Sequence, residues 1–273
     1  MKLILNKNVK AIIPPWGGEL LIEVLQHLDF KNIRANPTWL YGYSDISTLL
    51  FAITVKTNIA SIHGLNLMDC IANQNDALSS CWEKPLQAKL NESFTQESSE
   101  YYQKEWGDFE KDPLAVFNLT EKTSWKSFSG TPKVKMSGRL LGGCLDVLQC
   151  LVGTPYGEVP KFAKQFAEPL IFYFENCELS PFDQARALWS MRYAGWFDHV
   201  SGFLIGRTNA IDADSKDKYS FLDSIQDVLA DLDVPIIYDA DIGHVPPQIN
   251  LVNGALSVLE FENGLGKITQ YYK

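Results

Sequence analysis

The chain has 273 residues, of which 46% are hydrophobic, and this composition excludes a disordered, collagen-like or low-complexity protein. The length corresponds to about two domains. The 24 basic and 33 acidic residues give a net charge of −9 without a basic run, which argues against nucleic acid or an anionic membrane as a partner.

The first 65 residues alternate short apolar runs with helical patterns of apolar residues. The patterns predict strands at 9–13, 38–41 and 58–62, with helices at 20–28 and 46–55 between them. Strands that alternate with helices are typical of a parallel sheet with crossover helices. We therefore expect residues 1–65 to form an N-terminal α/β unit.

The stretch from residue 66 to 136 is polar, and its periodicity is weaker. It is too long for an ordinary connection between two elements. It also contains Trp82, Trp106 and Trp125, which make it too aromatic for a passive linker. We expect residues 66–136 to be a partly ordered connecting segment that lies against the rest of the chain.

Residues 137–273 are expected to form a second, C-terminal α/β unit. The apolar patterns predict helices at 142–151, 181–193 and 221–232, and strands at 170–174, 200–205 and 234–238. Two short alternating segments, 255–261 and 267–272, are typical of antiparallel strands and give this unit a β-rich tail.

The apolar runs are well short of the ~20 residues that span a bilayer. The first eight residues contain too few consecutive apolar residues for a signal peptide. The five cysteines form no C-x-x-C pair, so the sequence indicates neither a disulfide framework nor a zinc site. We expect a soluble, cytoplasmic protein whose cysteines stay reduced.

Ser44 lies where the strand predicted at 38–41 runs directly into the next helix. A serine at such a turn projects from the carboxyl edge of a parallel sheet, at the positive end of the helix. This is the arrangement of a nucleophile elbow, although Ile46 stands where the G-x-S-x-G pattern has its second glycine. The alternative is that Ser44 or Asp45 only caps the helix.

A serine nucleophile needs a base and an acceptor that orients the base. Two of the four histidines, His27 and His199, are expected at the surface. His63 ends a strand at the same sheet edge, and His244 follows a buried strand on a loop rich in glycine and proline. Glu175 follows a strongly apolar strand, where a carboxylate is costly unless it is paired. Alternatively, Glu175 only caps the next helix.

An ordered set of segments runs along the chain: Val9-Lys-Ala-Ile-Ile-Pro-Pro-Trp-Gly-Gly18, Leu28-Asp-Phe-Lys-Asn-Ile-Arg-Ala-Asn-Pro37, Gly42-Tyr-Ser-Asp-Ile46, His63-Gly64, Ser137-Gly-Arg-Leu-Leu-Gly-Gly143, Phe172-Tyr-Phe-Glu175, Val200-Ser-Gly-Phe-Leu-Ile-Gly206 and Asp241-Ile-Gly-His244. In this order they resemble the LD-carboxypeptidase family of serine peptidases over nearly the whole chain. The resemblance implies a flavodoxin-like N-terminal unit that carries the nucleophile, and a Ser-Glu-His triad at Ser44, Glu175 and His244.

The same resemblance implies an oxyanion hole formed by the backbone N–H of Asp45 and by that of Gly17 or Gly18. Such a triad hydrolyses an amide without a metal ion or an organic cofactor. One branch of the family removes the terminal D-alanine of a murein tetrapeptide. The other, the MccF-like branch of microcin C immunity peptidases, cleaves the amide that joins an amino acid to a nucleotide-like group.

The length of the 66–136 segment resembles the MccF-like branch. We therefore expect a peptide or aminoacyl-nucleotide substrate, with His63, Trp106 and Trp125 as substrate-binding residues, because an aromatic ring can stack on a base. The alternative is that the tryptophans only pack between the two units.

The chain departs from the family at its N-terminus, where far fewer residues precede the strand at 9–13. Trp16 also replaces an arginine, Glu19 an aromatic residue and Cys144 an asparagine. A shortened N-terminal unit would expose a sheet edge, so we expect a homodimer. A truncated family member that binds a ligand without catalysis is the competing interpretation.

Overall fold

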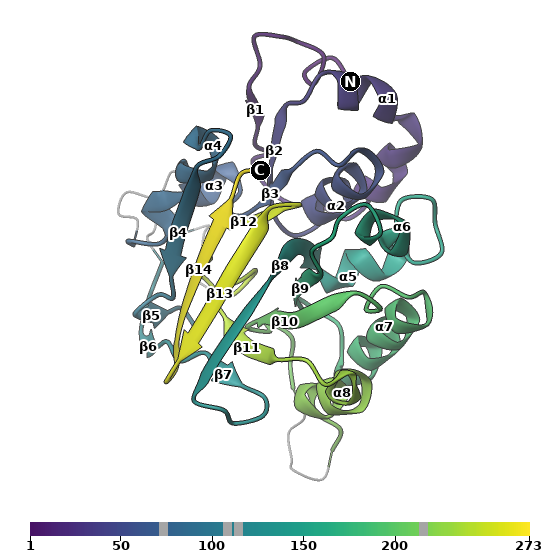
Figure 1. The fold of residues 1–273 in the computed structure, drawn as a ribbon. Helices are drawn as coiled ribbons and strands as arrows, with labels where there is room; N and C mark the ends of the chain where they lie inside the picture. The colour runs from purple at the N-terminus through teal and green to yellow at the C-terminus, as the bar shows by residue number, and fades with distance from the viewer. Residues whose placement is uncertain (71–75, 106–110, 112–116, 213–217) are drawn as a thin grey trace.

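The computed structural model describes residues 1–70, 76–105, 111, 117–212 and 218–273. Within these residues the strands form a four-stranded, an eight-stranded and a two-stranded sheet. Figure 1 shows the elements of the first 65 residues gathered at one end of the molecule, next to the larger sheet. The expected α/β class, with parallel strands in both units and a strand-rich C-terminal end, is confirmed.

The N-terminal sheet has the strand order β1-β2-β3-β12. Its strands are β1 (Ala11–Ile12), β2 (Trp39–Gly42), β3 (Ser61–His63) and β12 (Leu251–Asn253). The first three are parallel, as the pattern of residues 1–65 predicts. The fourth strand, β12, comes from the C-terminal part of the chain and pairs antiparallel with β3, which the sequence did not predict.

The helix predicted at 20–28 is instead a 3₁₀ helix, η1 (Leu21–His27), followed by a separate α1 (Phe30–Ala35). Leu20 offers no side-chain cap at the start of η1, whereas the Asp29 carboxylate accepts the Asn32 N–H at 3.0 Å and starts α1. The apolar spacing at 20–28 therefore forms one short 3₁₀ helix, and the cap at Asp29 starts a second helix that the sequence analysis did not predict.

Helix α2 (Ile46–Thr57) is buried on nearly all sides, with nine of its 12 residues inside the protein. A helix that is apolar all round lies between packing layers rather than on a surface. It contacts β2 and β3 of the small sheet, and also β8 and α5 of the large one. The two units therefore share α2, and Ser44 lies immediately before this helix.

The large sheet has the order β4-β14-β13-β8-β9-β10-β11-β7. Its parallel centre consists of β8 (Lys133–Cys144), β9 (Leu170–Glu175), β10 (Val200–Gly206) and β11 (Ile236–Ala240). The expected tail forms the antiparallel strands β13 (Leu256–Glu262) and β14 (Leu265–Tyr271). Because the carboxyl ends of parallel strands meet at one edge, the residues that end β8, β9 and β11 come together.

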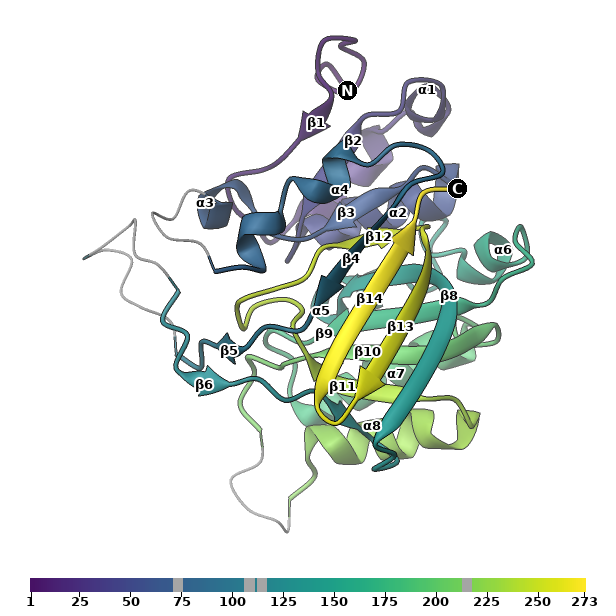
Figure 2. The ribbon, with the colours of Figure 1, turned by 60° about the vertical axis from the view of Figure 1, so that its left-hand side comes forward.

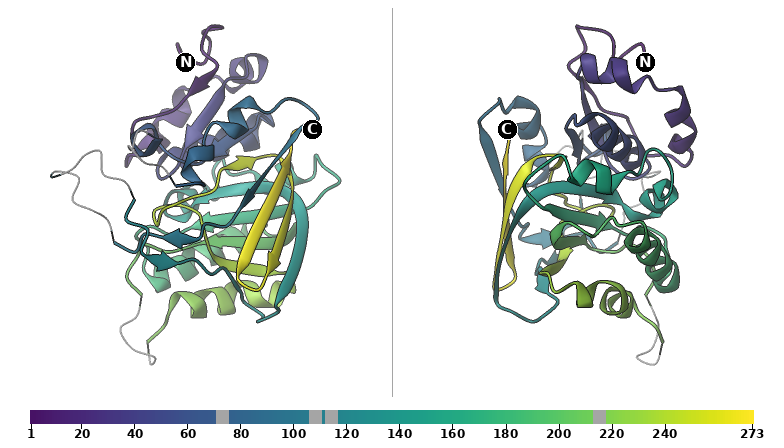
Figure 3. Two further views of the ribbon diagram at one scale, coloured as in Figure 1. Left: turned by 90° about the vertical axis from the view of Figure 1, so that its left-hand side faces the viewer. Right: turned by 45° about the vertical axis from the view of Figure 1, so that its right-hand side comes forward.

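The helices α7 (Pro181–Tyr193) and α8 (Phe221–Leu229) pack against each other and cover one face of this sheet (Figure 3). The shorter helices are α5 (Leu145–Leu148), η3 (Gln149–Leu151), α6 (Val159–Ala163) and η4 (Ala230–Leu232). The helix predicted at 142–151 therefore begins three residues late. Its first residues are the end of the long strand β8, where they pair with β9.

The segment 66–136 supplies both outer strands of the large sheet. Strand β4 (Ser93–Glu97) pairs with β14, as Figure 2 shows, and β7 (Lys126–Ser127) pairs with β11. Its other elements are α3 (Leu67–Cys70), η2 (Ser79–Cys81), α4 (Lys84–Gln87) and the hairpin of β5 (Tyr101–Tyr102) with β6 (Glu121–Lys122). The described residues of the segment thus pack against the rest of the chain.

The small sheet ends in β1, and the exposed apolar side chains of Leu3, Trp16 and Leu20 belong to the same part of the chain. This is the edge that the homodimer expectation concerns. The structure describes one chain, so the homodimer stays a prediction. No helix in the described part of the chain is long and apolar enough to cross a membrane.

Asp241 joins the segment 66–136 to the large sheet from a position without exposed surface. Its carboxylate pairs with the buried Arg207 guanidinium. The same carboxylate accepts hydrogen bonds from the Ser99 N–H at 2.9 Å, the Ser99 hydroxyl at 2.6 Å and the Trp125 indole N–H at 2.8 Å. A buried charge is tolerated when it is paired and hydrogen-bonded in this way.

We expect Asp241→Ala to lower the free energy of unfolding by about 3–5 kcal/mol, because the substitution leaves the Arg207 guanidinium buried without its counter-charge. Urea denaturation measures the change. Glu260→Ala serves as the control, since Glu260 pairs with Lys135 at the surface, where water screens the interaction. Equal unfolding midpoints for Asp241→Ala and Glu260→Ala would contradict the expectation.

Candidate active site

Ser44 lies in the turn between β2 and α2 with a left-handed backbone conformation, φ 63°. A side-chain-bearing residue at positive φ is uncommon, and such strain is concentrated at functional sites. Asp45 makes no side-chain cap to α2. Its carboxylate instead accepts the Leu21 N–H at 2.9 Å and so ties the preceding loop to this turn. The turn therefore presents the Ser44 hydroxyl rather than using it to cap the helix.

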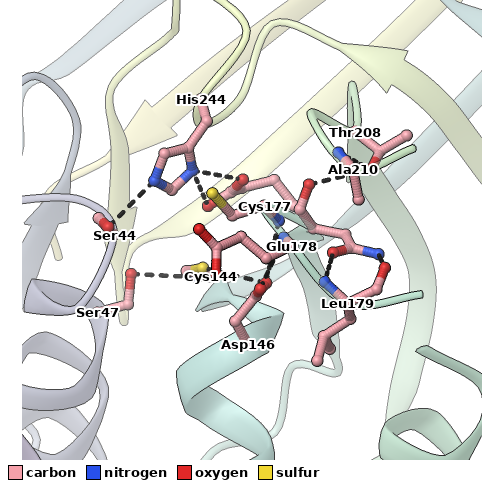
Figure 4. A network of polar contacts seen from close by, with 12 residues as sticks. Ser44, Ser47, Cys144, Asp146, Cys177, Glu178, Leu179, Thr208, Ala210 and His244 are labelled. Atoms are coloured by element: carbon pink, nitrogen blue, oxygen red, sulfur yellow. Dashed lines mark hydrogen bonds and ion pairs between the residues drawn. The ribbon is translucent and has the colours of Figure 1, made fainter. Parts of the chain in front are cut away.

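His244 reaches Ser44 from the loop after β11 (Figure 4). Its Nε2 lies 3.0 Å from the Ser44 Oγ, and its Nδ1 lies 2.9 Å and 3.1 Å from the two carboxylate oxygens of Glu175. The preceding Gly243 has φ +85°, and a Cβ there would lie 2.2 Å from the Glu175 Cγ. Only glycine allows the loop to pass this close to the carboxylate.

Glu175 is the last residue of β9 rather than the first one after it, and it has no exposed surface. Burial alone would raise the pKa of this carboxyl. The charge of His244 and the hydrogen bonds with His244 and Cys144 outweigh burial and hold the pKa below its usual value. Glu175 is therefore an ionised acceptor inside the protein, and it is not a helix cap.

Burial alone would lower the pKa of His244. The Glu175 carboxylate and the hydrogen bonds with Cys177 and Glu175 outweigh burial and raise the pKa above the ordinary 6.5. The carboxylate also holds the ring proton on Nδ1 whenever the ring is neutral. In that form the lone pair of Nε2 faces the Ser44 hydroxyl, as a general base requires.

The glycines expected in the oxyanion hole lie against the same turn. A Cβ on Gly17 would be 2.8 Å from the Ser44 Oγ and 3.6 Å from the Asp45 backbone nitrogen. A Cβ on Gly18 would be 3.1 Å from the Asp45 carboxylate. The structure therefore brings Gly17, Gly18 and Asp45 together around the Ser44 hydroxyl.

His63, which the sequence analysis expects to bind substrate, is enclosed by protein. It is fully buried, between the rings of Tyr43 and Tyr173, and burial lowers its pKa to about 4. Neither of its ring nitrogens has a hydrogen-bond partner among the described residues. A neutral histidine behind Tyr43 supports the site by packing, since Tyr43 in turn packs edge-on against His244 at 5.0 Å.

Trp125 is the second residue that the sequence analysis expects to bind substrate and that the structure buries. Only 1% of its surface is exposed, and its indole N–H is used by Asp241. Apolar burial and a satisfied N–H make it a core residue, which is the packing alternative stated for the tryptophans. Trp106, the other tryptophan expected to bind substrate, lies outside the described residues.

The sequence did not point to the groups beside the Glu175 carboxylate. Cys144 ends β8 in register with Glu175, and Asp146 accepts the backbone N–H of Cys177 at 3.0 Å and that of Glu178 at 2.8 Å. The sequence contains two signals for these groups: the departure from the family at Cys144, and the position of Cys177 two residues after Glu175. Cys144, Glu175 and His244 are also the residues, among those described, whose donor atoms lie close enough to hold a metal ion.

A cavity of about 400 Å³ adjoins the loop that carries His244, since Val245 is part of its wall. Four of the ten wall residues are positively charged, namely Lys104, Lys122, Lys126 and Arg207, and one, Asp239, is negatively charged. Lys126 pairs with Asp239 at 2.7 Å, and Arg207 pairs with Asp241. In a chain of net charge −9, this concentration of cations indicates a site that attracts an anionic group.

The chain is similar in sequence to the microcin C7 self-immunity protein MccF of Escherichia coli, with 24% identity over 99% of this chain and 77% of that protein. It is 24% identical to a protein of Bacillus subtilis named "Probable murein peptide carboxypeptidase", over 93% of this chain and 70% of that protein. In structure it is similar to an MccF-like protein of Bacillus anthracis, with a TM-score of 0.80 and 22% identity over 99% of this chain and 78% of that one.

Two family models match the two parts of the chain in the expected order. Residues 1–64 match the LD-carboxypeptidase N-terminal domain, and residues 137–259 match the LD-carboxypeptidase C-terminal domain. Together they account for well over half of the sequence, and the resemblance drawn from the ordered segments is confirmed. The chain therefore belongs to the LD-carboxypeptidase family of serine peptidases.

Proposed function

We propose that this chain hydrolyses an amide bond with Ser44 as the nucleophile, His244 as the general base and Glu175 as the residue that orients the base. One observation carries the proposal: Ser44 Oγ, His244 and the Glu175 carboxylate form a continuous chain of contacts of 3.0 Å and 2.9 Å. Nucleophile, base and orienting acceptor in this order define serine hydrolases on unrelated folds.

In the proposed reaction, His244 Nε2 takes the proton of the Ser44 hydroxyl while the Oγ attacks the carbonyl carbon of the amide. The oxyanion that forms accepts hydrogen bonds from the backbone N–H of Asp45 and of Gly17 or Gly18, and each such donor contributes roughly 3 kcal/mol where it has been measured. His244 then gives the proton to the leaving amine. Water hydrolyses the acyl ester on Ser44 with His244 again as the base.

Glu175 stays ionised throughout this cycle. Its negative charge stabilises the imidazolium of His244 that forms in each half of the reaction. The lowered pKa of Glu175 and the raised pKa of His244 both express this pairing. No step requires a metal ion.

We propose an amino acid joined by an amide-type bond to a nucleotide-like group as the substrate. Solved structures of MccF contain glutamyl sulfamoyl guanosine and aspartyl sulfamoyl adenosine, and those proteins resemble this chain with a TM-score of 0.78. The cationic cavity next to Val245 supports a substrate that carries negative charge.

A murein tetrapeptide is the second candidate substrate. The named activity of the Bacillus subtilis relative favours it, and so does the similarity to a muramoyltetrapeptide carboxypeptidase of Oxalobacter formigenes, with a TM-score of 0.73 and 18% identity. Such a peptide also carries carboxylates that the cationic cavity could attract. The cavity therefore does not separate the two candidates, and the substrate has to be tested directly.

Ser44→Ala should reduce kcat by at least about 10³-fold, because the remaining groups cannot form the acyl intermediate. The thermal midpoint should stay close to the wild-type value, since the substitution removes one half-exposed hydroxyl. Ser129→Ala, at an exposed serine, is the matched control and should keep full activity. Ser44→Ala enzyme that retains more than a few per cent of the activity would exclude Ser44 as the nucleophile.

Activity should fall as the pH is lowered, because protonation of His244 removes the lone pair that accepts the Ser44 proton. The midpoint should lie above the ordinary histidine pKa of 6.5, since Glu175 raises the pKa of His244. Glu175→Gln should move this midpoint to lower pH and also lower the maximal rate. Profiles of kcat/KM against pH measure both effects, with Glu178→Gln at an exposed carboxylate as the control. An unmoved midpoint in Glu175→Gln would contradict the pairing.

The substrate is tested by incubating the protein with glutamyl sulfamoyl guanosine and, separately, with a murein tetrapeptide. We expect free glutamate and sulfamoyl guanosine, detected by mass spectrometry and absent with Ser44→Ala. Release of D-alanine from the tetrapeptide alone would establish the second candidate. Failure to cleave either compound would favour the non-catalytic interpretation.

A further inference from the structure

Two cysteine thiols lie beside the Glu175–His244 pair. Cys144 is paired in register with Glu175 on the neighbouring parallel strand, so the two side chains lie on the same face of the sheet. Its thiol is buried and donates to the Asp146 carboxylate at 3.5 Å. Cys177 follows Glu175 by two residues, and its thiol lies close enough to His244 to contribute to the raised pKa of that ring. Figure 4 shows the Cys177 sulfur beside the His244 ring and the Cys144 sulfur below it, on the side of Ser47 and Asp146.

These side chains form a set of donors of the kind that binds a metal ion. One ligand atom each from Cys144, Glu175 and His244 all lie within 4.8 Å of one another. Thiolate sulfur, imidazole nitrogen and a carboxylate oxygen are the ligands that Zn²⁺ takes in proteins, usually four at a time in tetrahedral arrangement. Cys177 is not one of these three close residues, and its thiol, which lies beside the His244 ring in Figure 4, would have to move closer to Cys144 and Glu175 to become the fourth ligand.

We propose that Cys144, Glu175 and His244, with Cys177, bind a thiophilic divalent cation such as Zn²⁺, and that its binding switches the peptidase off. This inference rests on the proposed function, because the metal would occupy the orienting half of the triad. Thiolate ligands select Zn²⁺ or Cd²⁺ over Mg²⁺ and Ca²⁺, which prefer oxygen ligands only.

The distances between the donor atoms of Cys144, Glu175 and His244 are already close to those that a tetrahedral metal ion requires. Two bonds of about 2.0–2.1 Å at a tetrahedral angle place a nitrogen and an oxygen about 3.3 Å apart. The His244 Nδ1 lies 2.9 Å and 3.1 Å from the Glu175 oxygens. A bond of about 2.3 Å to sulfur requires about 3.6 Å between sulfur and nitrogen. A thiol within 4.8 Å reaches that distance by a shift of roughly an ångström.

A metal ion at this position takes the place of the proton on His244 Nδ1. An uncharged imidazole bound to metal through Nδ1 carries its proton on Nε2. Nε2 then has no lone pair for the Ser44 hydroxyl, 3.0 Å away, and the nucleophile loses its base. A charged imidazolium ring releases its Nδ1 proton to solvent and keeps the one on Nε2, whereas a neutral ring exchanges its Nδ1 proton for one on Nε2 with no net loss. The thiol protons leave to solvent as the metal binds.

The site is accessible from one side. The His244 side chain is 16% exposed and Cys177 is partly exposed, whereas Glu175 and Cys144 form the buried wall. A cation would enter past His244 and Cys177. The N–H groups of Cys177 and Glu178 are held by Asp146, which keeps this side of the site in place.

The direct test is a titration of the reduced protein with Cd²⁺, followed by the ultraviolet charge-transfer absorption of cadmium–thiolate bonds. We expect the absorption to saturate near one equivalent. Cys144→Ser keeps a hydroxyl donor for Asp146, and it should raise the Cd²⁺ concentration at half-saturation at least about tenfold, as ligand loss does. Cys177→Ser should weaken binding in the same direction.

Cys150→Ser is the matched control, because Cys150 is an exposed thiol outside this cluster. It should bind Cd²⁺ as the wild type does. The proposal is overturned if the wild type gives no absorption at one equivalent, or if Cys144→Ser and Cys177→Ser both keep the wild-type titration. If Cys144→Ser fails to fold, Cys177→Ser, on a partly exposed loop, decides the question.

The second arm measures hydrolysis in the presence of Zn²⁺. Wild type and Cys150→Ser should be inhibited and should recover on addition of EDTA, while Cys144→Ser should need at least about tenfold more Zn²⁺ for the same inhibition. Cd²⁺ binding without inhibition by Zn²⁺ would overturn the switch. A protein that hydrolyses neither substrate would refute the proposed function, and the cadmium titration would still decide whether the metal site exists.

Discussion

The site depends on a carboxylate that is held, ionised, at the end of an apolar strand. Glu175 has no exposed surface, and removing an unpaired carboxylate from water would cost far more than the fold could recover. His244 and the Cys144 thiol stabilise the charge in place of water. The loop after β11 must therefore run against this carboxylate, and that route requires a glycine at position 243. The position of the base thus follows from the burial of the acid.

Helices and strands with an unambiguous capping residue or apolar pattern were predictable from the sequence. Helix α7 begins at Pro181 and ends at Tyr193 as predicted, because Ser180 caps it and its apolar spacing is regular. Strand β9 is an uninterrupted apolar run. Strand β8 was missed although its first half alternates charged and apolar residues, because its end is glycine-rich and the apolar residues that follow favour a helix. Strand β12 was missed because three residues carry too little pattern.

The site could be predicted only in part, since its members are far apart along the chain. Ser44 is separated from His244 by 200 residues, so no local spacing joins them, and the ordered family segments supplied the connection. The errors at His63 and Trp125 have a different cause. Trp125 lies in a polar segment and His63 at the end of a strand. Neither position indicates whether tertiary packing covers the side chain, and both side chains are buried.

The strand order has a consequence for how the chain can be divided. Strands β4 and β7 precede β8 in sequence but close the two ends of the large sheet, while β12 leaves the large unit to complete the small sheet. For a boundary drawn along the chain just before β8, each sheet therefore contains at least one strand from the other side. The pairings of β4, β7 and β12 are all of long sequence separation, which makes assembly slow. The two units are therefore interlocked through their strands, and neither part released by a cut just before β8 would have a complete sheet.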